Sequence, residues 1–122
     1  MSEPGRKAEV HAARLAAERH TTDERLVGLR RAFEEASDAS EDSNADDEHD
    51  PEGATIAYER SQIAALIDQA QAHLAAIDAA EERLEAGTYG LCSVCGEPIP
   101  EGRLEARPTA TTCVLHASAS AS

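Results

Sequence analysis

Three cysteines and one histidine close to the C-terminus are the residues best suited to chemistry in this sequence. Cys92 and Cys95 are separated by two residues, and Cys113 and His116 repeat that spacing further along, in the pattern C-x2-C-x17-C-x2-H. Two thiolates at this spacing can bind one metal ion, because the tight turn between them directs both sulfurs to the same side. A second pair completes a tetrahedron, and a neutral imidazole nitrogen is an acceptable fourth ligand. The pattern therefore predicts one structural zinc ion bound by these four side chains.

Two other interpretations of these residues remain open at this stage. Cys92 and Cys95 alone could form a redox pair, although such pairs usually follow a strand at a helix N-terminus, and here a helical pattern comes first. His116 could also be a bystander, with the metal lost or held by three thiolates and water. A catalytic zinc ion would need a pocket and a base as well. The sequence indicates neither of these, so we expect a protein without enzymatic activity.

Two helix-forming segments precede the cysteines and must position them. Residues 10–37 and 54–87 are rich in Ala, Glu, Arg and Leu, whereas the acidic segment between them contains Ser, Asn, Pro and Gly. In the second segment apolar residues recur at heptad spacing, interrupted by Arg60 and Glu81, and the first segment has a weaker version of this pattern. The apolar positions are Leu15, Leu26, Leu29, Phe33 and Ala36 in the first segment, and Ile56, Ile63, Ile67, Ala70, Leu74, Ile77 and Leu84 in the second.

Two amphipathic helices joined by a loop most simply fold as an antiparallel hairpin, seam against seam. Gly87 suits the end of the second helix and Gly96 the turn after the first cysteine pair, because glycine accepts a positive φ. We therefore predict a mainly α fold, in which a long antiparallel helical hairpin (a coiled coil) carries a small C-terminal zinc-finger base. The expected segments are a flexible N-terminus at 1–9, the hairpin at 10–86 with an acidic tip loop at about 38–53, the zinc finger at 87–117 and a disordered tail at 118–122.

The composition excludes several classes of function. The 122 residues include one Phe, two Tyr and no Trp, which favours a thin helical seam over a thick globular core. A formal net charge of −13 argues against direct binding to nucleic acid, including sequence-specific binding to DNA. The sequence has neither an apolar run long enough to span a membrane nor an apolar signal segment. We therefore expect a cytoplasmic monomer that makes no membrane contact.

The stretch "YGLCSVCGEPIPEGRLEARPTATTC" resembles the zinc-finger signature of the DksA/TraR family of bacterial RNA polymerase-binding transcription regulators. The helical segments and the acidic loop also fit that family, so the resemblance covers most of the chain from about residue 10. The positions that match the signature are Tyr89, Gly90, Cys92, Cys95, Gly96, Ile99, Arg103, Leu104, Ala106, Pro108 and Cys113.

The resemblance implies a fold, a partner and a mode of action. Family members insert a helical hairpin, which projects from a zinc base, into the secondary channel of RNA polymerase, and they do not read DNA. They alter the stability of open complexes at chosen promoters, often together with guanosine tetraphosphate. An acidic hairpin suits a channel with basic walls. Carboxylates at its tip could approach the Mg²⁺ ion of the polymerase active site or the basic groups around it.

The sequence departs from the family pattern at the metal site and at the tip. His116 stands where the family has a fourth cysteine, an exchange that zinc accepts. The best-studied tip of the family has two aspartates three apart, followed two residues later by alanine. Asp50, Glu52 and Ala54 are the nearest match here, whereas Asp47 and Asp50 have the right mutual spacing but lie too far from Ala54. We expect Asp47, Asp50, Glu52 and Ala54 to form the polymerase-contacting tip. This expectation rests on their residue types, because their spacing does not match the family pattern.

A third departure concerns the alarmone. The family's alarmone contacts include basic residues on the second helix and just after the finger. Ala76 and Ala117 occupy two of these positions, and only Arg107 remains basic. We therefore expect no strong binding of guanosine tetraphosphate through this protein. Arg103 and Arg107 could contact the alarmone or the polymerase, or could instead pair with glutamates at the surface of the finger.

The remaining expectations concern surface histidines, the packing of the finger and a rival function. No cysteine accompanies the other histidines, so we expect them at the surface rather than at a metal. These histidines are His11, His20, His49 and His73. Ile99 and Leu104 are expected to pack the base of the finger.

The rival function is that of a zinc-finger adaptor, which binds another protein and does not act on RNA polymerase.

Overall fold

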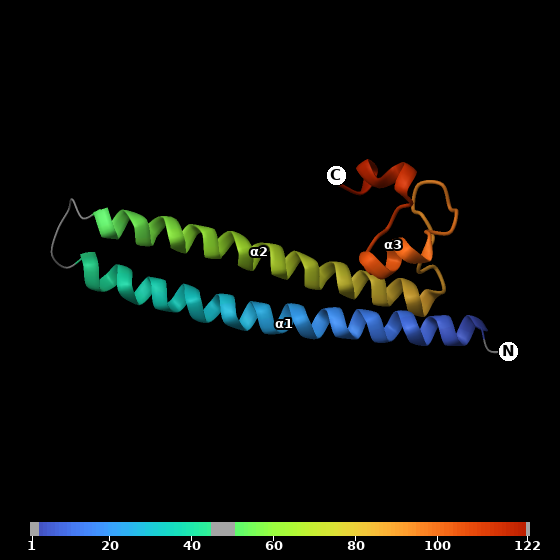
Figure 1. Ribbon diagram of the computed structural model, residues 1–122, viewed down its shortest axis with the longest axis horizontal. Helices are drawn as coiled ribbons and strands as arrows, with labels where there is room; N and C mark the ends of the chain where they lie inside the picture. Colours follow the sequence, from blue (N-terminus) through green and yellow to red (C-terminus); the bar gives the residue numbers. More distant parts are fainter. Residues whose placement is uncertain (1–2, 45–50, 122) are drawn as a thin grey trace. The chain divides into compact units, whose positions relative to one another are not determined.

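The computed structural model describes residues 3–44 and 51–121. In these ranges the chain is mainly helical, and its only β-type pairing is an isolated antiparallel bridge between Leu91 and Pro98. Two long helices pack as an antiparallel hairpin (Figure 1), and a cysteine-containing segment follows them, which confirms the predicted fold class. The elements are α1 (Glu3–Asn44), α2 (Pro51–Ala86), α3 (Glu101–Ala106) and a 3₁₀ segment, η1 (Val114–Ala121).

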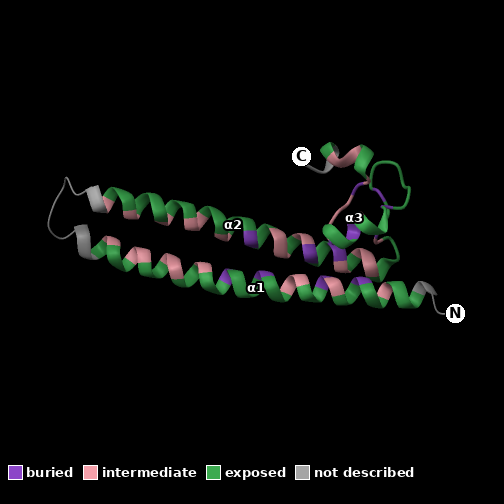
Figure 2. Ribbon diagram, in the orientation of Figure 1, coloured by how far each residue is buried: buried purple, intermediate pink, exposed green. Residues whose placement is uncertain are grey.

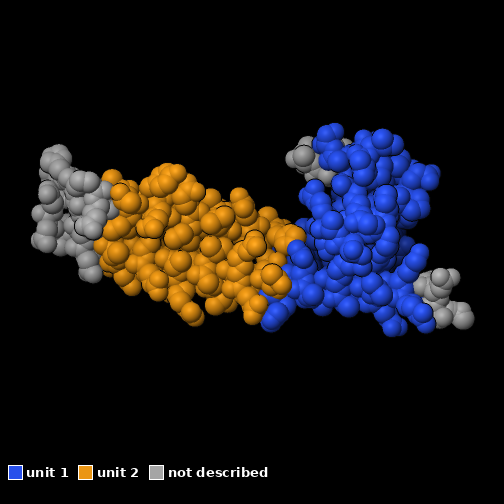
Figure 3. Space-filling model, in the orientation of Figure 1, with its two compact units in different colours: residues 1–20, 74–122 blue, residues 21–73 orange. Residues whose placement is uncertain are grey.

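The chain divides into two compact units, which are coloured separately in Figure 3. Unit 1 comprises Met1–His20 and Leu74–Ser122, and unit 2 comprises Thr21–His73. Both α1 and α2 cross the boundary between these ranges, so each unit contains one stretch of each long helix. All the cysteines belong to unit 1.

The core of unit 1 lies between the first part of α1 and the last part of α2. Leu15 from α1 and Ile77 and Ala80 from α2 have no solvent-exposed surface. Removing a leucine or isoleucine side chain from water contributes roughly 1.5–3 kcal/mol. The buried positions, purple in Figure 2, lie on both helices and therefore join them. The residues packed around this core are Leu74, Leu84 and Tyr89.

The seam of unit 2 is shallower. Leu26 and Ala70 are 6% and 4% exposed, and the other apolar heptad positions of the unit are only partly buried. Alanine at a central position buries little area, so this unit gains less from apolar burial than a seam of leucines would. The heptad assignment is nevertheless confirmed. None of the described helices is both long and apolar enough to cross a membrane. The partly buried heptad positions are Leu29, Phe33, Ala36, Ile56, Ile63 and Ile67.

The two polar residues that interrupt the heptad are used in contacts between the helices. In unit 2, the guanidinium carbon of Arg60 lies 5.9 Å from the centre of the Phe33 ring, a distance at which a cation is attracted to an aromatic face. In unit 1, Arg19 of α1 donates a 2.6 Å hydrogen bond to Glu81 and also pairs with Asp78. Each interruption therefore replaces an apolar contact with a polar one across the same seam.

The start of α1 lies inside the segment 1–9, for which the sequence predicted a flexible N-terminus. The helix begins at Glu3, although Pro4 and Gly5 had suggested irregular structure. Proline is tolerated in the first helical turn, because the backbone N–H that it lacks would have no partner inside the helix. Residues 3–9 therefore belong to α1.

The other helix ends also differ from the predicted boundaries. α1 continues to Asn44 and α2 begins at Pro51, so both helices extend into the segment expected as a tip loop at about 38–53. Pro51 again occupies a first turn, where it is compatible with a helix. At the C-terminus, η1 reaches Ala121 and passes the predicted end of the finger at residue 117.

α2 ends as the sequence predicts. Gly87 follows the last helical residue with φ of +80°, a conformation that side chains with a Cβ rarely adopt. Its amide donates to the carbonyl of Leu84 over 3.3 Å, and the amide of Thr88 donates to that of Arg83 over 2.9 Å. These bonds satisfy carbonyls of the last helical turn. The glycine thereby turns the chain out of the hairpin and into the cysteine segment.

Candidate metal centre

Two turns present the predicted metal ligands. In the first turn, the amide of Gly96 donates to the carbonyl of Cys92 over 2.9 Å, and Gly96 has φ of +76°. In the second turn, the amide of His116 donates to the carbonyl of Cys113 over 3.1 Å. A 2.8 Å hydrogen bond from the Ser93 amide to the carbonyl of Thr111 joins the two segments. The backbone therefore places both ligand pairs side by side, as their spacing predicted.

The four donor atoms are arranged as a zinc ion requires. They lie within 4.8 Å of one another. The sulfurs of Cys95 and Cys113 are 3.9 Å apart, and His116 Nδ1 is 3.2 Å from the Cys113 sulfur and 3.7 Å from that of Cys92. Tetrahedral zinc, with Zn–S of about 2.3 Å and Zn–N of about 2.05 Å, places two sulfurs about 3.8 Å apart and a sulfur and a nitrogen about 3.5 Å apart. The site therefore fits one zinc ion.

The electrostatic surroundings favour an ionised thiol at Cys92. Burial opposes ionisation of this side chain, which is 3% exposed, but hydrogen bonds from the backbone amides of Cys95, Cys113 and Val94 outweigh burial and lower the pKa of Cys92 to about 5. The Val94 amide lies 3.4 Å from the sulfur. At Cys95, a backbone hydrogen bond from Glu97 favours the thiolate, but burial and the neighbouring thiols prevail and raise the pKa. A divalent cation compensates such repulsion between thiolates.

A small apolar core supports the ligand turns. Ile99 and Leu104 are 4% and 2% exposed and pack with Cys92, which confirms the predicted base of the finger. Gly90 has φ of +82°, and a Cβ at this position would lie 3.3 Å from Leu104 Cδ1, so this turn needs glycine. The Tyr89 hydroxyl donates to the carbonyl of Pro108 over 2.7 Å. These contacts fix the chain on both sides of the first cysteine pair.

The two arginines singled out in the sequence have different environments. Arg103 donates through Nε to the carbonyl of Thr112 over 2.7 Å, next to the ligand Cys113. That side chain therefore supports the second ligand turn, a contact that the sequence did not predict. Arg107 is exposed, and its amide closes the end of α3 by donating to the carbonyl of Arg103.

His11 contradicts the expectation that it lies at the surface. It is 8% exposed, its ring centre is 4.7 Å from that of Tyr89, and its Nε2 lies 3.1 Å from the carboxylate of Glu101. Arg14 is 3.5 Å from the same carboxylate. Burial raises the pKa of Glu101, but the interactions with His11 and Arg14 outweigh it, and the pKa falls below its ordinary value. His11 precedes Leu15 by one helical turn, and this spacing places both on the buried face of α1.

The remaining residues singled out in the sequence differ in exposure, and some lie outside the described residues. His20 is exposed and His73 is partly buried. Of the predicted tip, Ala54 is exposed on α2. The metal quartet is the one group of candidate ligands that the described part of the chain brings together. The residues that lie outside the described residues are Asp47, His49 and Asp50, together with the side chain of Glu52.

The finger and the whole fold match known proteins. The family model described as the prokaryotic dksA/traR C4-type zinc finger matches residues 87–114. The structure of the transcription factor DksA2 from Pseudomonas aeruginosa is similar over 98% of this chain and 85% of that one, with a TM-score of 0.75 and 26% sequence identity. Three of the four candidate ligands lie inside the matched finger, and His116 lies just beyond it.

Two curated relatives extend the comparison. The protein YteA of Bacillus subtilis is 44% identical over 75 residues, which are 62% of this chain and 31% of YteA. The RNA polymerase-binding transcription factor DksA of Caulobacter vibrioides is 51% identical over 47 residues, 38% of this chain and 33% of that factor. The matched segments thus span about a third of the length of these relatives. The finger matches the DksA/TraR family model, and the helical hairpin that carries it is similar to the DksA2 structure.

Proposed function

We propose that Cys92, Cys95, Cys113 and His116 bind a single zinc ion with a structural role. The distances between their donor atoms support this assignment, and so does Nδ1 of His116, the ring nitrogen nearest to the sulfurs. Bound zinc supplies a cross-link between the two turns, which the small apolar core alone would hold weakly. The four ligands leave no open position for a substrate, so we propose no catalytic activity.

We further propose that the protein is a bacterial transcription regulator that binds RNA polymerase through its secondary channel. The observation that carries this proposal is the family fold, a helical hairpin with a zinc finger at its base, matched over 98% of the chain. A relative from Caulobacter is named as an RNA polymerase-binding transcription factor. The net charge of −13 supports contact with a basic protein surface and disfavours contact with DNA.

We propose the acidic end of the hairpin as the effector. In the sequence, Asp47 and Asp50 lie between α1 and α2 and Glu52 follows them, and Ala54 is exposed on α2. Carboxylate oxygens are the ligands that Mg²⁺ prefers, and they pair with basic side chains as well. We propose no role for guanosine tetraphosphate through Ala76 and Ala117, because neither side chain can pair with a phosphate.

Binding and transcription with purified bacterial RNA polymerase test this function. The wild-type chain should bind the polymerase and change transcription from a ribosomal promoter in vitro, to the same extent with and without guanosine tetraphosphate. The double variant Asp50→Ala/Glu52→Ala should lose the effect on transcription. Glu59→Ala, an exposed glutamate on α2, is the matched control and should keep it. If the wild-type chain does not bind the polymerase at all, the regulator proposal fails and the zinc-finger adaptor takes its place.

A further inference from the structure

The seam of unit 1 is incompletely filled near the start of α1. Beyond Leu15, the heptad positions of α1 that approach α2 are Ala12 and Ala8, whose side chains are too short to cover Leu84. A groove of about 500 Å³ remains there, large enough for one or two side chains. Its lining is mostly apolar, with acidic residues at its edge, and consists of Ala8, Glu9, Ala12, Glu81, Leu84 and Glu85.

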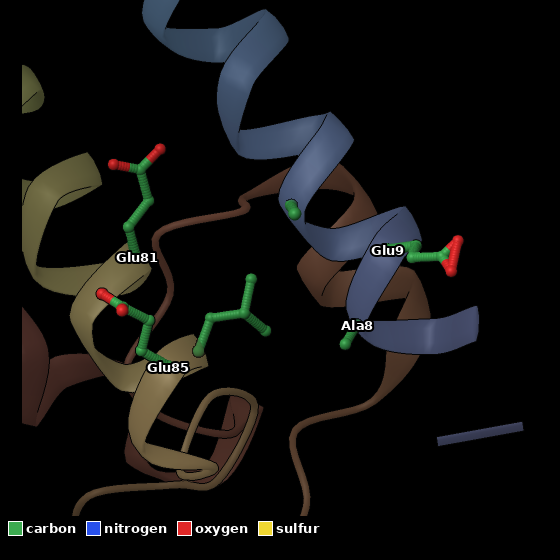
Figure 4. Close-up of a pocket in the computed structure, with 6 residues that line it drawn as sticks. Ala8, Glu9, Glu81 and Glu85 are labelled. Carbon is green, nitrogen blue, oxygen red and sulfur yellow. The ribbon is translucent and has the colours of Figure 1, made fainter. Parts of the chain in front are cut away.

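The charge at the edge of the groove has one sign. Figure 4 shows Glu81 and Glu85 projecting from α2 on one side of the groove, with Ala8 and Glu9 on α1 opposite them and the Glu9 carboxylate on the outer side of its helix. Glu81 already pairs with Arg19. Glu85 is exposed and has no ion pair or hydrogen bond with any residue that the structure describes. A cation that approached the groove would therefore find a carboxylate available at Glu85.

We propose that this groove docks a cationic amphipathic helix of a partner protein. A leucine or isoleucine of that helix would fill the space above Ala8 and Ala12 and contact Leu84. A lysine or arginine one turn away would pair with Glu85. This is the usual way in which a helix binds a groove between two helices, with apolar anchors spaced by one turn and charges beside them.

The charge of the groove selects this occupant over others. Nucleic acid and anionic membrane surfaces are repelled by an acidic edge. A second copy of the chain, with its own net charge of −13, would bring acidic surface against acidic surface. The proposal does not depend on RNA polymerase as the partner of the acidic tip, because the groove is lined by residues of unit 1 and shares none with the tip.

An NMR titration of the zinc-loaded, ¹⁵N-labelled chain tests the proposal. The probe is a synthetic helix of about 18 residues, or five turns, with leucines along one stripe and lysines beside them. Saturable shifts should appear at the amides of residues 8–12 and 81–85, and the affinity should fall as salt is added. The same peptide with glutamate in place of every lysine should cause no shifts. Shifts spread evenly over the acidic surface, or a dimer of the chain in light scattering, would overturn the proposal.

Two variants with matched controls locate the binding. Ala12→Leu fills the groove from within, so it should keep or raise the melting temperature and weaken peptide binding about tenfold. Ala13→Leu, at an exposed position that does not line the groove, should leave the affinity unchanged. Glu85→Gln should weaken binding several-fold and flatten its salt dependence, whereas Glu59→Gln should do neither. Unchanged affinity in Ala12→Leu would overturn the proposal, and if that variant misfolds, unchanged affinity in Glu85→Gln would do so.

Discussion

Leu15→Ala tests the core of unit 1 most simply. Leu15 has no exposed surface and contacts a cluster whose other buried members are Ile77 and Ala80. The change removes three carbon atoms from that cluster, worth about 0.8 kcal/mol each in transfer free energy. Leu→Ala changes at buried sites cost about 2.7–5.0 kcal/mol, the difference being the cavity left behind. The surrounding side chains Leu74, Leu84 and Tyr89 are only partly buried and can close partly on the space, so we expect a loss of about 3 kcal/mol.

Urea denaturation followed by circular dichroism measures this loss, and the melting temperature should fall by roughly 10 °C. The matched control is Val27→Ala, since Val27 is 57% exposed on the same helix and should change stability by less than about 0.5 kcal/mol. A loss below about 1 kcal/mol in Leu15→Ala, with unchanged helix content, would refute the assignment of Leu15 to the core.

Three further predictions concern the finger. Gly90→Ala should destabilise the finger by about 1 kcal/mol or more, because alanine is strained at a positive φ and its Cβ would crowd Leu104. The variant should therefore release zinc to a chelator faster than the control Gly102→Ala, where an added Cβ has no atom within 4 Å. The lowered pKa of Glu101 adds stability above its ordinary pKa of 4.5, and this stability is lost as pH falls through the lower folded value. Glu101→Gln should therefore reduce the pH dependence of the urea concentration at the unfolding midpoint in that acidic range. An unchanged pH dependence would show that the contacts with His11 and Arg14 are not maintained in solution. His116→Ala should lower the affinity for zinc, since it removes one of four ligands, and equal zinc competition by wild type and variant would exclude His116 as a ligand.

Local spacing was enough to predict the parts of the molecule that depend on neighbours in sequence. The turns after Cys92 and Cys113 follow from their two-residue spacing, and the buried side of α2 follows from its heptad. Glycines at 87 and 96 have the positive φ values that their positions indicated. The helix ends were less predictable, because proline interrupts the interior of a helix but is accepted in its first turn. Pro4 and Pro51 both lie in a first turn.

Other features depend on residues far apart in sequence and could not be predicted from local pattern. His11 is buried because Tyr89 and Glu101 fold back onto α1, with 90 residues separating His11 from Glu101. Arg103 supports the second ligand turn through a backbone carbonyl, which carries no signal in the sequence. The open groove exists because the small residues Ala8 and Ala12 of α1 lie opposite Leu84 across the seam.

Zinc K-edge X-ray absorption spectroscopy of the purified wild-type chain is the most direct test of the proposed metal site, because it counts the ligands by element. We predict one zinc ion per chain, with three sulfur atoms at about 2.3 Å and one nitrogen at about 2.05 Å. In His116→Cys the nitrogen should be replaced by a fourth sulfur. A wild-type shell with two sulfurs, or one that is unchanged in His116→Ala, would contradict the site formed by Cys92, Cys95, Cys113 and His116.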